Sequence, residues 1–225
     1  MYPWVSCLAR KEYNEAQFRQ LPCHDRTLLR ARSPPVVHPD ALTVFCPTLS
    51  PSESSAALVN EIFVLSKDQV AALKRACAGG GVGRVSTFCA LSAHVWRCLC
   101  VARRLPPDAT TRLTFTANVR RSLRPPLPDR YFGNGIIMVG TAGKVGEIRS
   151  EELASVAGRI SGTVRRVDDE VVRSVIDYVE MVGRPVMHAG SMPETELMVV
   201  SWLGMPMYEA GFRWGKPRAM QLAAQ

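Results

Sequence analysis

The sequence lacks the features of a metalloprotein, a membrane protein or a secreted, disulfide-rich protein. Its seven cysteines include no Cys-x-x-Cys pair, and an odd number cannot close into a complete set of intramolecular disulfides. No apolar run approaches the roughly 18 residues of a membrane span, and Glu12 and Glu15 follow a short apolar start, unlike a signal or transit peptide. We therefore predict no metal, no membrane partner and a cytoplasmic location, where unpaired cysteines stay reduced.

Familiar catalytic motifs are missing as well. The glycine-rich residues 79–84 follow a predicted helix and lack the Gly-Lys-Ser/Thr of a phosphate-binding loop, so termination of that helix explains them better. Ser191 lacks the flanking glycines of a nucleophile elbow. No ligand cluster is formed by the four histidines, which are His24, His38, His94 and His188. For His94 we expect a packing or capping role rather than catalysis.

The chain does contain enough apolar residues for a substantial core, and it carries an excess of positive charge. Its 225 residues are 47% hydrophobic and 21% charged, with a formal net charge of +8, which is typical of a soluble globular protein. The length suits one large domain, or one domain and part of another. Most basic residues are arginines, which favour an anionic partner or simply solubility. The sequence contains no run of five or six like charges, and this absence argues against a nucleic-acid-binding tail.

Hydrophobic spacing and capping residues predict an alternation of helices and strands. The prolines before Ser55 indicate an extended crossover connection. We expect strands at residues 58–64, 113–119, 136–139 and 197–202, and helices that begin at Ser66, near Ser86, near Leu153 and at Asp168. The helix that begins near Ser86 is expected to bury a stripe formed by Phe88, Leu91, Val95 and Leu99. Strands separated by helices predict an α/β layered fold.

Four blocks of the sequence form an ordered pattern. They are His24 to Pro35, the heptapeptide Leu91-Ser92-Ala93-His94-Val95-Trp96-Arg97, the segment Asn118 to Asn134 with Tyr131-Phe132-Gly133-Asn134 at its end, and Ser201-Trp202 followed by the 211–217 block. In this order they resemble the plant BAHD acyltransferase family, and most closely its hydroxycinnamoyltransferase branch. The resemblance covers about Pro22 to Pro217.

The resemblance implies an α/β fold, namely a chloramphenicol-acetyltransferase-like domain with a mixed sheet and flanking helices, incomplete at both ends. Residues 1–22 would be a divergent N-terminal segment, residues 23–55 the end of an N-terminal domain with its crossover loop, and residues 56–225 a C-terminal acyltransferase domain without its final strands. It also implies transfer of an acyl group, expected to be hydroxycinnamoyl, from a CoA thioester to an alcohol or amine. Acyl-CoA would be the co-substrate, with no bound cofactor, no nucleic-acid partner and a monomeric complete form.

One departure from the family pattern concerns catalysis. In the family, the histidine of an H-x-x-x-D motif removes the proton of the acceptor. Here the residues four positions after the histidines are Leu28, Leu42, Cys98 and Met192. We therefore assign no catalytic residue and expect the chain alone to be inactive. The alternative is a truncated, non-catalytic remnant that acts as an interaction protein, and a third, weaker hypothesis is anion or nucleic-acid binding.

The resemblance and the helix pattern suggest four residues for binding. Ser86 and Thr87, at a predicted helix start, are candidates for CoA contact because amides there can receive phosphate, although N-capping is the simpler role. Trp202 is a candidate wall of the acceptor pocket. Gly204 stands where shikimate-using relatives carry an arginine, which argues against a shikimate acceptor.

A structural motif near the C-terminus also departs from the family. The family's Asp-Phe-Gly-Trp-Gly block corresponds here to Gly211, Phe212, Arg213, Trp214 and Gly215. The resemblance implies that Gly211 cannot form the ion pair of the aspartate it replaces. Arg213 replaces a glycine and would be strained if its φ is positive.

Overall fold

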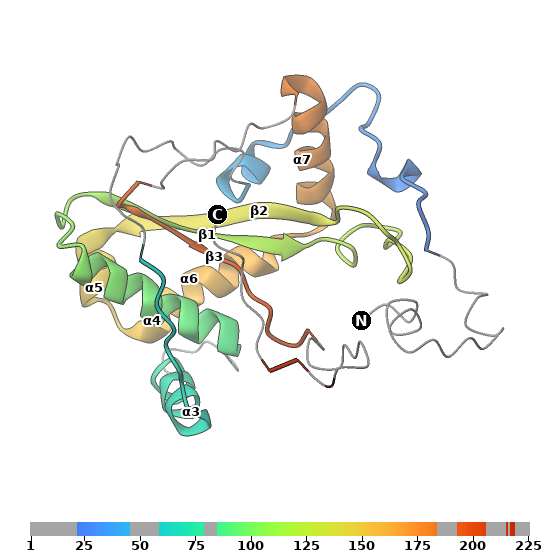
Figure 1. Ribbon diagram of the computed structural model, residues 1–225. Helices are drawn as coiled ribbons and strands as arrows, with labels where there is room; N and C mark the ends of the chain where they lie inside the picture. Colours follow the sequence, from blue (N-terminus) through green and yellow to red (C-terminus); the bar gives the residue numbers. More distant parts are fainter. Residues whose placement is uncertain are drawn as a thin grey trace. The chain divides into compact units, whose positions relative to one another are not determined.

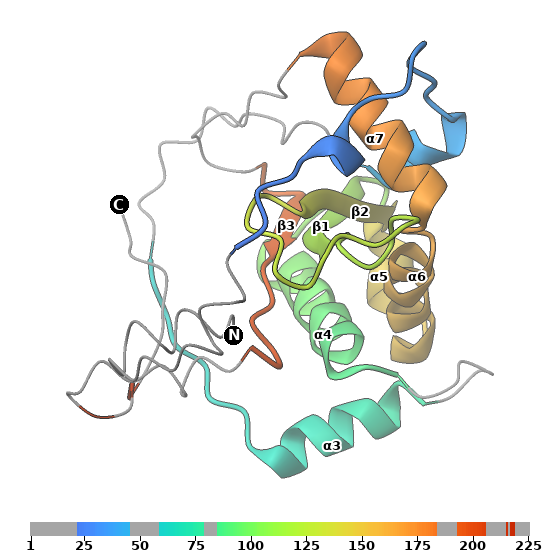
Figure 2. The ribbon, with the colours of Figure 1, turned by 90° about the vertical axis from the view of Figure 1, so that its right-hand side faces the viewer.

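The computed structural model of the chain describes residues 22–45, 59–78, 85–183, 193–205, 215 and 217–218 (Figures 1 and 2). It divides into two units. The smaller comprises Met1–Leu28, Leu127–Asn134 and Trp202–Gln225, and the larger comprises Leu29–Pro126 and Gly135–Ser201. All of the strands and α-helices named below belong to the larger unit.

In the described part of the chain, the larger unit is built on a mixed, three-stranded sheet with the order β2-β1-β3. β1 (Thr110–Asn118) pairs antiparallel with β2 (Ile136–Lys144) along its whole length and parallel with the short β3 (Glu196–Val199). The predicted strands at 113–119 and 136–139 are confirmed, with β2 longer than its apolar run. The last strand is confirmed but ends at Val199, before Trp202.

Helices cover both faces of this sheet (Figures 1 and 2). One face carries α4 (Thr87–Ala102), α5 (Val145–Ser150) and α6 (Leu153–Arg165), and α3 (Lys67–Ala76) lies against α4. The other carries α7 (Asp169–Val182) with the 3-10 helix η2 (Pro39–Thr43). A second 3-10 helix, η1, covers Thr27–Leu29. The predicted α/β layers with a mixed sheet are confirmed. None of the helices among the described residues has the length and apolarity to cross a membrane.

Local capping interactions start the helices at the predicted residues. Gln69 N donates to Ser66 Oγ at 3.1 Å while Ser66 N donates to Gln69 Oε1 at 2.8 Å, which is a complete capping box. Val171 N donates to Asp168 Oδ1 at 2.9 Å at the start of α7. The glycines at 79–84 lie outside the described residues.

The strand predicted at 58–64 is wrong over its described residues. Residues 59–66 belong to no strand, and Leu58 lies outside the described part. Ile62, Phe63 and Val64 are 81–87% exposed. Alternating apolar residues favour a strand only where a neighbouring strand takes up the backbone hydrogen bonds, and no described strand pairs with these residues.

The core lies between the sheet and the helices α4, α5 and α6. The face of α4 that is buried in this core differs from the predicted one. The residues that face inward are Cys89, Ala93, Trp96 and Cys100. Of the predicted stripe, Val95 is 44% exposed, and Phe88 and Leu99 are only partly buried at the edge of the core. Small side chains let α4 approach the sheet closely, and Trp96 fills the space that remains.

Candidate functional site

Ser86 and Thr87 lie at the N-terminus of α4. Ser86 is the N-cap residue, and its Oγ accepts a hydrogen bond from Cys89 N at 3.1 Å, so the simpler role suggested by the sequence is confirmed. The first-turn amides of an α-helix have no acceptor within the helix, which leaves donors beside the cap. Contact of Ser86 and Thr87 with CoA stays a prediction.

Trp202 and Gly204 share a turn in the smaller unit, closed by a hydrogen bond from Met205 N to Trp202 O at 3.1 Å. Gly204 has a φ of +77°, and nothing lies within 4 Å of the position that a Cβ would take. The backbone conformation, rather than lack of space, therefore favours glycine here. Trp202 is partly exposed, and its role as a pocket wall stays a prediction.

The structural motif at 211–215 is described only at its last residue. Gly215 has a φ of +104°, a conformation in which glycine is strongly preferred. Gly211, Phe212, Arg213 and Trp214 lie outside the described residues, and with them the predicted strain at Arg213.

The packing or capping role predicted for His94 is wrong, because His94 lies on the exposed face of α4. Its Nε2 is 3.6 Å from Cys98 Sγ, one helical turn further on.

The His24 ring packs edge to face against Phe132, with 5.6 Å between the ring centroids. His38 Nδ1 accepts a hydrogen bond from Asp40 N at 3.3 Å. Among the described residues no three histidine, cysteine or acidic side chains gather as metal ligands would.

A buried chain of hydrogen bonds joins α4 to the sheet. The Trp96 indole Nε1 donates to Thr111 Oγ1 at 2.9 Å, and that hydroxyl donates to Thr195 O at 2.8 Å. Trp96 and Thr111 are both fully buried. The hydroxyl of this buried threonine has a hydrogen-bond partner on each side, as a buried polar group requires. This chain fixes α4, β1 and the residue before β3 relative to one another.

Arg97, next to Trp96, ties α4 to the end of α5. Its Nε donates to Ile148 O at 2.9 Å and its Nη2 donates to Glu151 O, so a cation satisfies carbonyls that a helix end leaves free. The Glu151 side chain pairs with Arg159. Burial alone would raise the pKa of Glu151, but hydrogen bonds from Ser155 and Arg159 outweigh it, and that pKa is lowered.

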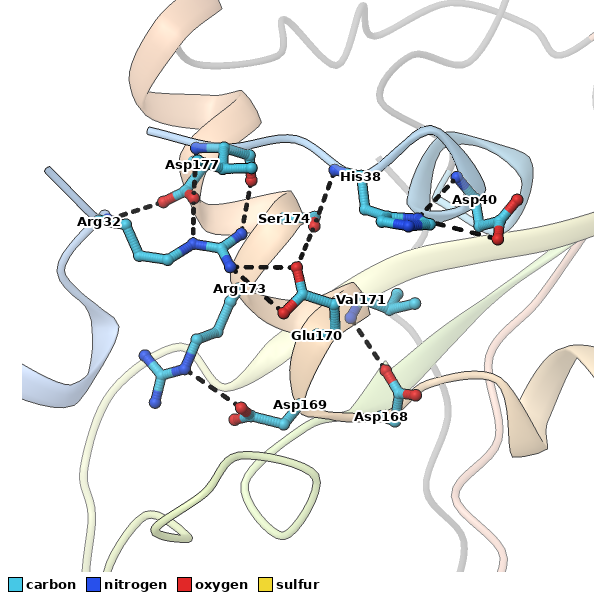
Figure 3. A network of polar contacts seen from close by, with 11 residues as sticks. Arg32, His38, Asp40, Asp168, Asp169, Glu170, Val171, Arg173, Ser174 and Asp177 are labelled. Atoms are coloured by element: carbon cyan, nitrogen blue, oxygen red, sulfur yellow. Dashed lines mark hydrogen bonds and ion pairs between the residues drawn. The ribbon is translucent and has the colours of Figure 1, made fainter. Parts of the chain in front are cut away.

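A buried carboxylate holds the segment 29–45 against α7 (Figure 3). Asp177 is 1% exposed. Its Oδ1 accepts from Arg32 N at 2.8 Å, and its Oδ2 accepts from Arg32 Nε at 2.6 Å and from Val36 N at 2.9 Å. Arg32 Nη1 also pairs with the exposed Glu170 at 3.0 Å. We call Arg32, Val36 and Asp177 the Asp177 clasp.

The electrostatics of the Asp177 clasp favour the charged carboxylate. Burial alone would raise the pKa of Asp177, but hydrogen bonds from Val36 N, Arg32 N and the Arg32 guanidinium outweigh it, so this pKa lies below its usual value. The hydrogen bond to Asp177 likewise raises the pKa of Arg32. The clasp therefore requires the ionised form of Asp177.

Beyond the Asp177 clasp, the segment 29–45 makes further contacts with α7 and with the edge of the sheet. His38 N donates to Ser174 Oγ at 3.1 Å (Figure 3). The Phe45 ring packs edge to face on Tyr178 of α7, with centroids 5.7 Å apart. Val44 O accepts from Gly140 N of β2 at 2.9 Å. The end of the segment thus pairs with β2 at one isolated bridge, between Phe45 and Val139.

Comparison with known proteins places these features in a family. The model of the Transferase family matches residues 3–224 of this chain. The chain belongs to the Transferase family. This is the family of the BAHD acyltransferases, and the resemblance carried by the four sequence blocks is confirmed.

Two BAHD relatives show how much of such a protein is present. Putrescine hydroxycinnamoyltransferase 1 of Oryza sativa subsp. japonica is 43% identical over 213 residues, which cover 89% of this chain and 47% of the relative. A hydroxycinnamoyltransferase of Narcissus pseudonarcissus is 35% identical over 212 residues, which cover 87% and 48%. The chain thus spans about half the length of the curated relatives it matches.

A solved structure shows the same fold. The crystal structure of F. graminearum TRI101 complexed with ethyl coenzyme A has a TM-score of 0.72 and 18% sequence identity, and the match covers 97% of this chain and 52% of that one. The fold predicted from the BAHD resemblance is confirmed.

Within this BAHD fold, Trp96 and Arg97 of the heptapeptide and Arg32 of the first block all make structural contacts. The sequence showed these residues as motif members, but not their partners.

Proposed function

We propose that this chain is a C-terminal part of a BAHD acyltransferase, which transfers a hydroxycinnamoyl group from a CoA thioester to an amine or alcohol. The observation that carries the proposal is the 43% identity over 213 residues to a putrescine hydroxycinnamoyltransferase, together with the order of the four motif blocks. Residues 23–55 would end the N-terminal domain and form the crossover, and residues 56–225 would belong to the C-terminal domain. The complete protein would be a cytoplasmic monomer of phenylpropanoid metabolism.

We favour an amine as the acceptor. The first relative is named for a diamine, putrescine. Gly204 has no side chain to bind a carboxylate, and its φ of +77° disfavours an arginine. Trp202, two residues earlier, would supply an apolar wall for the acceptor's methylene chain.

The acyl donor would be a CoA thioester, used as a co-substrate without a bound cofactor. The support is the shared fold with TRI101, whose crystal structure contains ethyl coenzyme A. The N-terminus of the 16-residue α4 at Ser86 and Thr87 offers amide donors and a positive dipole end for a phosphate.

The chain alone is expected to form no product from p-coumaroyl-CoA and putrescine. Its sequence contains no H-x-x-x-D motif, and loss of a general base lowers a rate by about 10²–10⁴-fold. The measurement follows p-coumaroyl-putrescine and free CoA by liquid chromatography. Turnover by the chain alone at a rate typical of enzymes would contradict the absence of the base.

Adding the part of a relative that this chain does not match is expected to produce activity. The first half of the rice relative, which this chain does not cover, is expressed separately and mixed with the chain. The control mixes the two halves of the rice enzyme itself. If the rice halves recover activity and the mixture with this chain does not, the acyltransferase proposal is wrong.

A second candidate function is a non-catalytic interaction protein, which the exposed apolar residues 62–64 favour. In this case the chain binds the first half of the rice enzyme, as measured by size-exclusion chromatography, but the mixture forms no product. Binding with product formation supports the acyltransferase.

A further inference from the structure

A cysteine and a histidine form a pair on the outward face of α4. His94 and Cys98 are one helical turn apart and both exposed, and the His94 Nε2 to Cys98 Sγ distance of 3.6 Å is within hydrogen-bonding range for sulfur. An imidazole at this distance can accept the thiol proton, and the thiolate is the nucleophilic form of cysteine. The pair therefore has a nucleophile, a proton acceptor and access to solvent.

The other described cysteines lack this combination. Cys77, Cys89 and Cys100 are buried. Burial raises the pKa of the Cys77 and Cys100 thiols, and so favours their unreactive protonated form. Cys23 is only partly exposed, and its backbone is bridged to Tyr131.

We propose that Cys98, with His94 as its proton acceptor, is a site of thiol–disulfide exchange with low-molecular-weight disulfides. The Cys98 thiol gives its proton to His94 Nε2, and the thiolate attacks one sulfur of the disulfide. A bond forms between Cys98 Sγ and that sulfur as the original S–S bond breaks. The leaving thiolate then takes the proton from His94. Cys98 is oxidised to a mixed disulfide, and half of the reagent is reduced to a thiol.

The position of Cys98 makes the modified protein compatible with the fold. On an α-helix, residues two positions apart point to nearly opposite sides, so Cys98 lies away from Trp96 and Cys100, which face the core. An adduct on Cys98 projects into solvent. Modification is therefore a reaction of the folded chain and needs no unfolding.

The test uses the full chain and oxidised glutathione, with the rate at each cysteine followed by peptide mass spectrometry. Cys98 is expected to react at least about ten-fold faster than Cys23, Cys77, Cys89 or Cys100. H94Q is expected to slow the reaction at Cys98 by about three- to ten-fold, because the glutamine amide cannot take up the thiol proton during the attack. H38Q, which removes another exposed histidine, is the matched control and leaves the rate unchanged.

A further variant separates chemistry from structure. C98S is expected to remove the fast-reacting site and to leave the unfolding midpoint unchanged. The proposal is overturned if a different described cysteine reacts first, or if Cys98 reacts at the same rate in folded H94Q as in the wild type. The outcome is independent of the proposed acyl transfer.

Discussion

Trp96→Ala is expected to lower the free energy of unfolding by about 3–5 kcal/mol. Trp96 is fully buried between α4 and the sheet, and alanine would leave a large cavity that the surrounding strands cannot fill. The change also removes the indole N–H that donates to Thr111 Oγ1 at 2.9 Å. Urea denaturation followed by circular dichroism measures the loss.

Val95→Ala is the matched control, one residue away on the same helix. Val95 is 44% exposed, and alanine has the higher helix propensity, so the expected change is within about 0.5 kcal/mol. If Trp96→Ala costs no more than Val95→Ala, α4 is not anchored by Trp96 as the structure shows.

Thr111→Val separates the hydrogen bonds from the packing. Valine has nearly the shape of threonine but leaves the indole N–H of Trp96 without its partner. It also removes one of two hydrogen bonds to Thr195 O, which still accepts from Arg112 N at 3.0 Å. The expected loss is about 1–3 kcal/mol. A double-mutant cycle with Trp96→Phe is expected to give a coupling energy of about 0.5–1.5 kcal/mol, and a coupling of zero would mean that the two side chains act independently.

The contrast between helix starts and helix faces shows what a sequence can predict in this fold. The starts at Ser66, Ser86 and Asp168 depend on a side chain and an amide within three residues, so a local pattern is sufficient. The buried face of α4 depends on which stripe meets the sheet. Hydrophobic spacing favours the larger residues, but close packing selected the small ones beside Trp96.

Long-range contacts explain the remaining differences. Arg32 stands out in the sequence only as part of a motif, and its partner Asp177 is 145 residues further on. Asp177 belongs to an otherwise amphipathic helix, where a single carboxylate is expected to face solvent. The extended character of residues 58–64 is a local preference, but pairing in a sheet requires a neighbour that the local sequence does not specify. The candidate residues Ser86 and Gly204 differ from Arg32, because their observed roles depend on local structure. Ser86 is the N-cap of α4, and Gly204 occupies a position with a positive φ.

Asp177→Asn is expected to lower the free energy of unfolding at pH 7 by about 2–4 kcal/mol. In the wild type, three N–H groups donate to the two oxygens of Asp177. An asparagine amide has one oxygen, and its NH₂ group would face donors. Release of the segment 29–45 is expected to accompany the loss, so trypsin should cleave after Arg30 and Arg32 faster in the variant than in the wild type.

The pH dependence distinguishes the charge of Asp177 from its shape. Because the folded pKa of Asp177 is lowered, the carboxylate contributes stability that is fully present above the unfolded value of about 3.9 and is lost as the pH falls through the folded pKa. The difference in unfolding free energy between wild type and Asp177→Asn should therefore be constant from about pH 5 to pH 8 and shrink below about pH 4. Contributions from other carboxylates, such as Glu151, cancel in this difference.

Glu170→Gln provides the control for Asp177→Asn, because Glu170 pairs with the same Arg32 from the same helix but is exposed. An exposed ion pair contributes about 0–1 kcal/mol, so Glu170→Gln should leave the stability and the trypsin cleavage nearly unchanged. Equal effects of the two substitutions would show that charge on α7, and not the buried hydrogen bonds of the Asp177 clasp, holds the segment. A larger effect of Asp177→Asn, confined to pH values above its folded pKa, follows only if the ionised carboxylate organises the backbone at Arg32 and Val36.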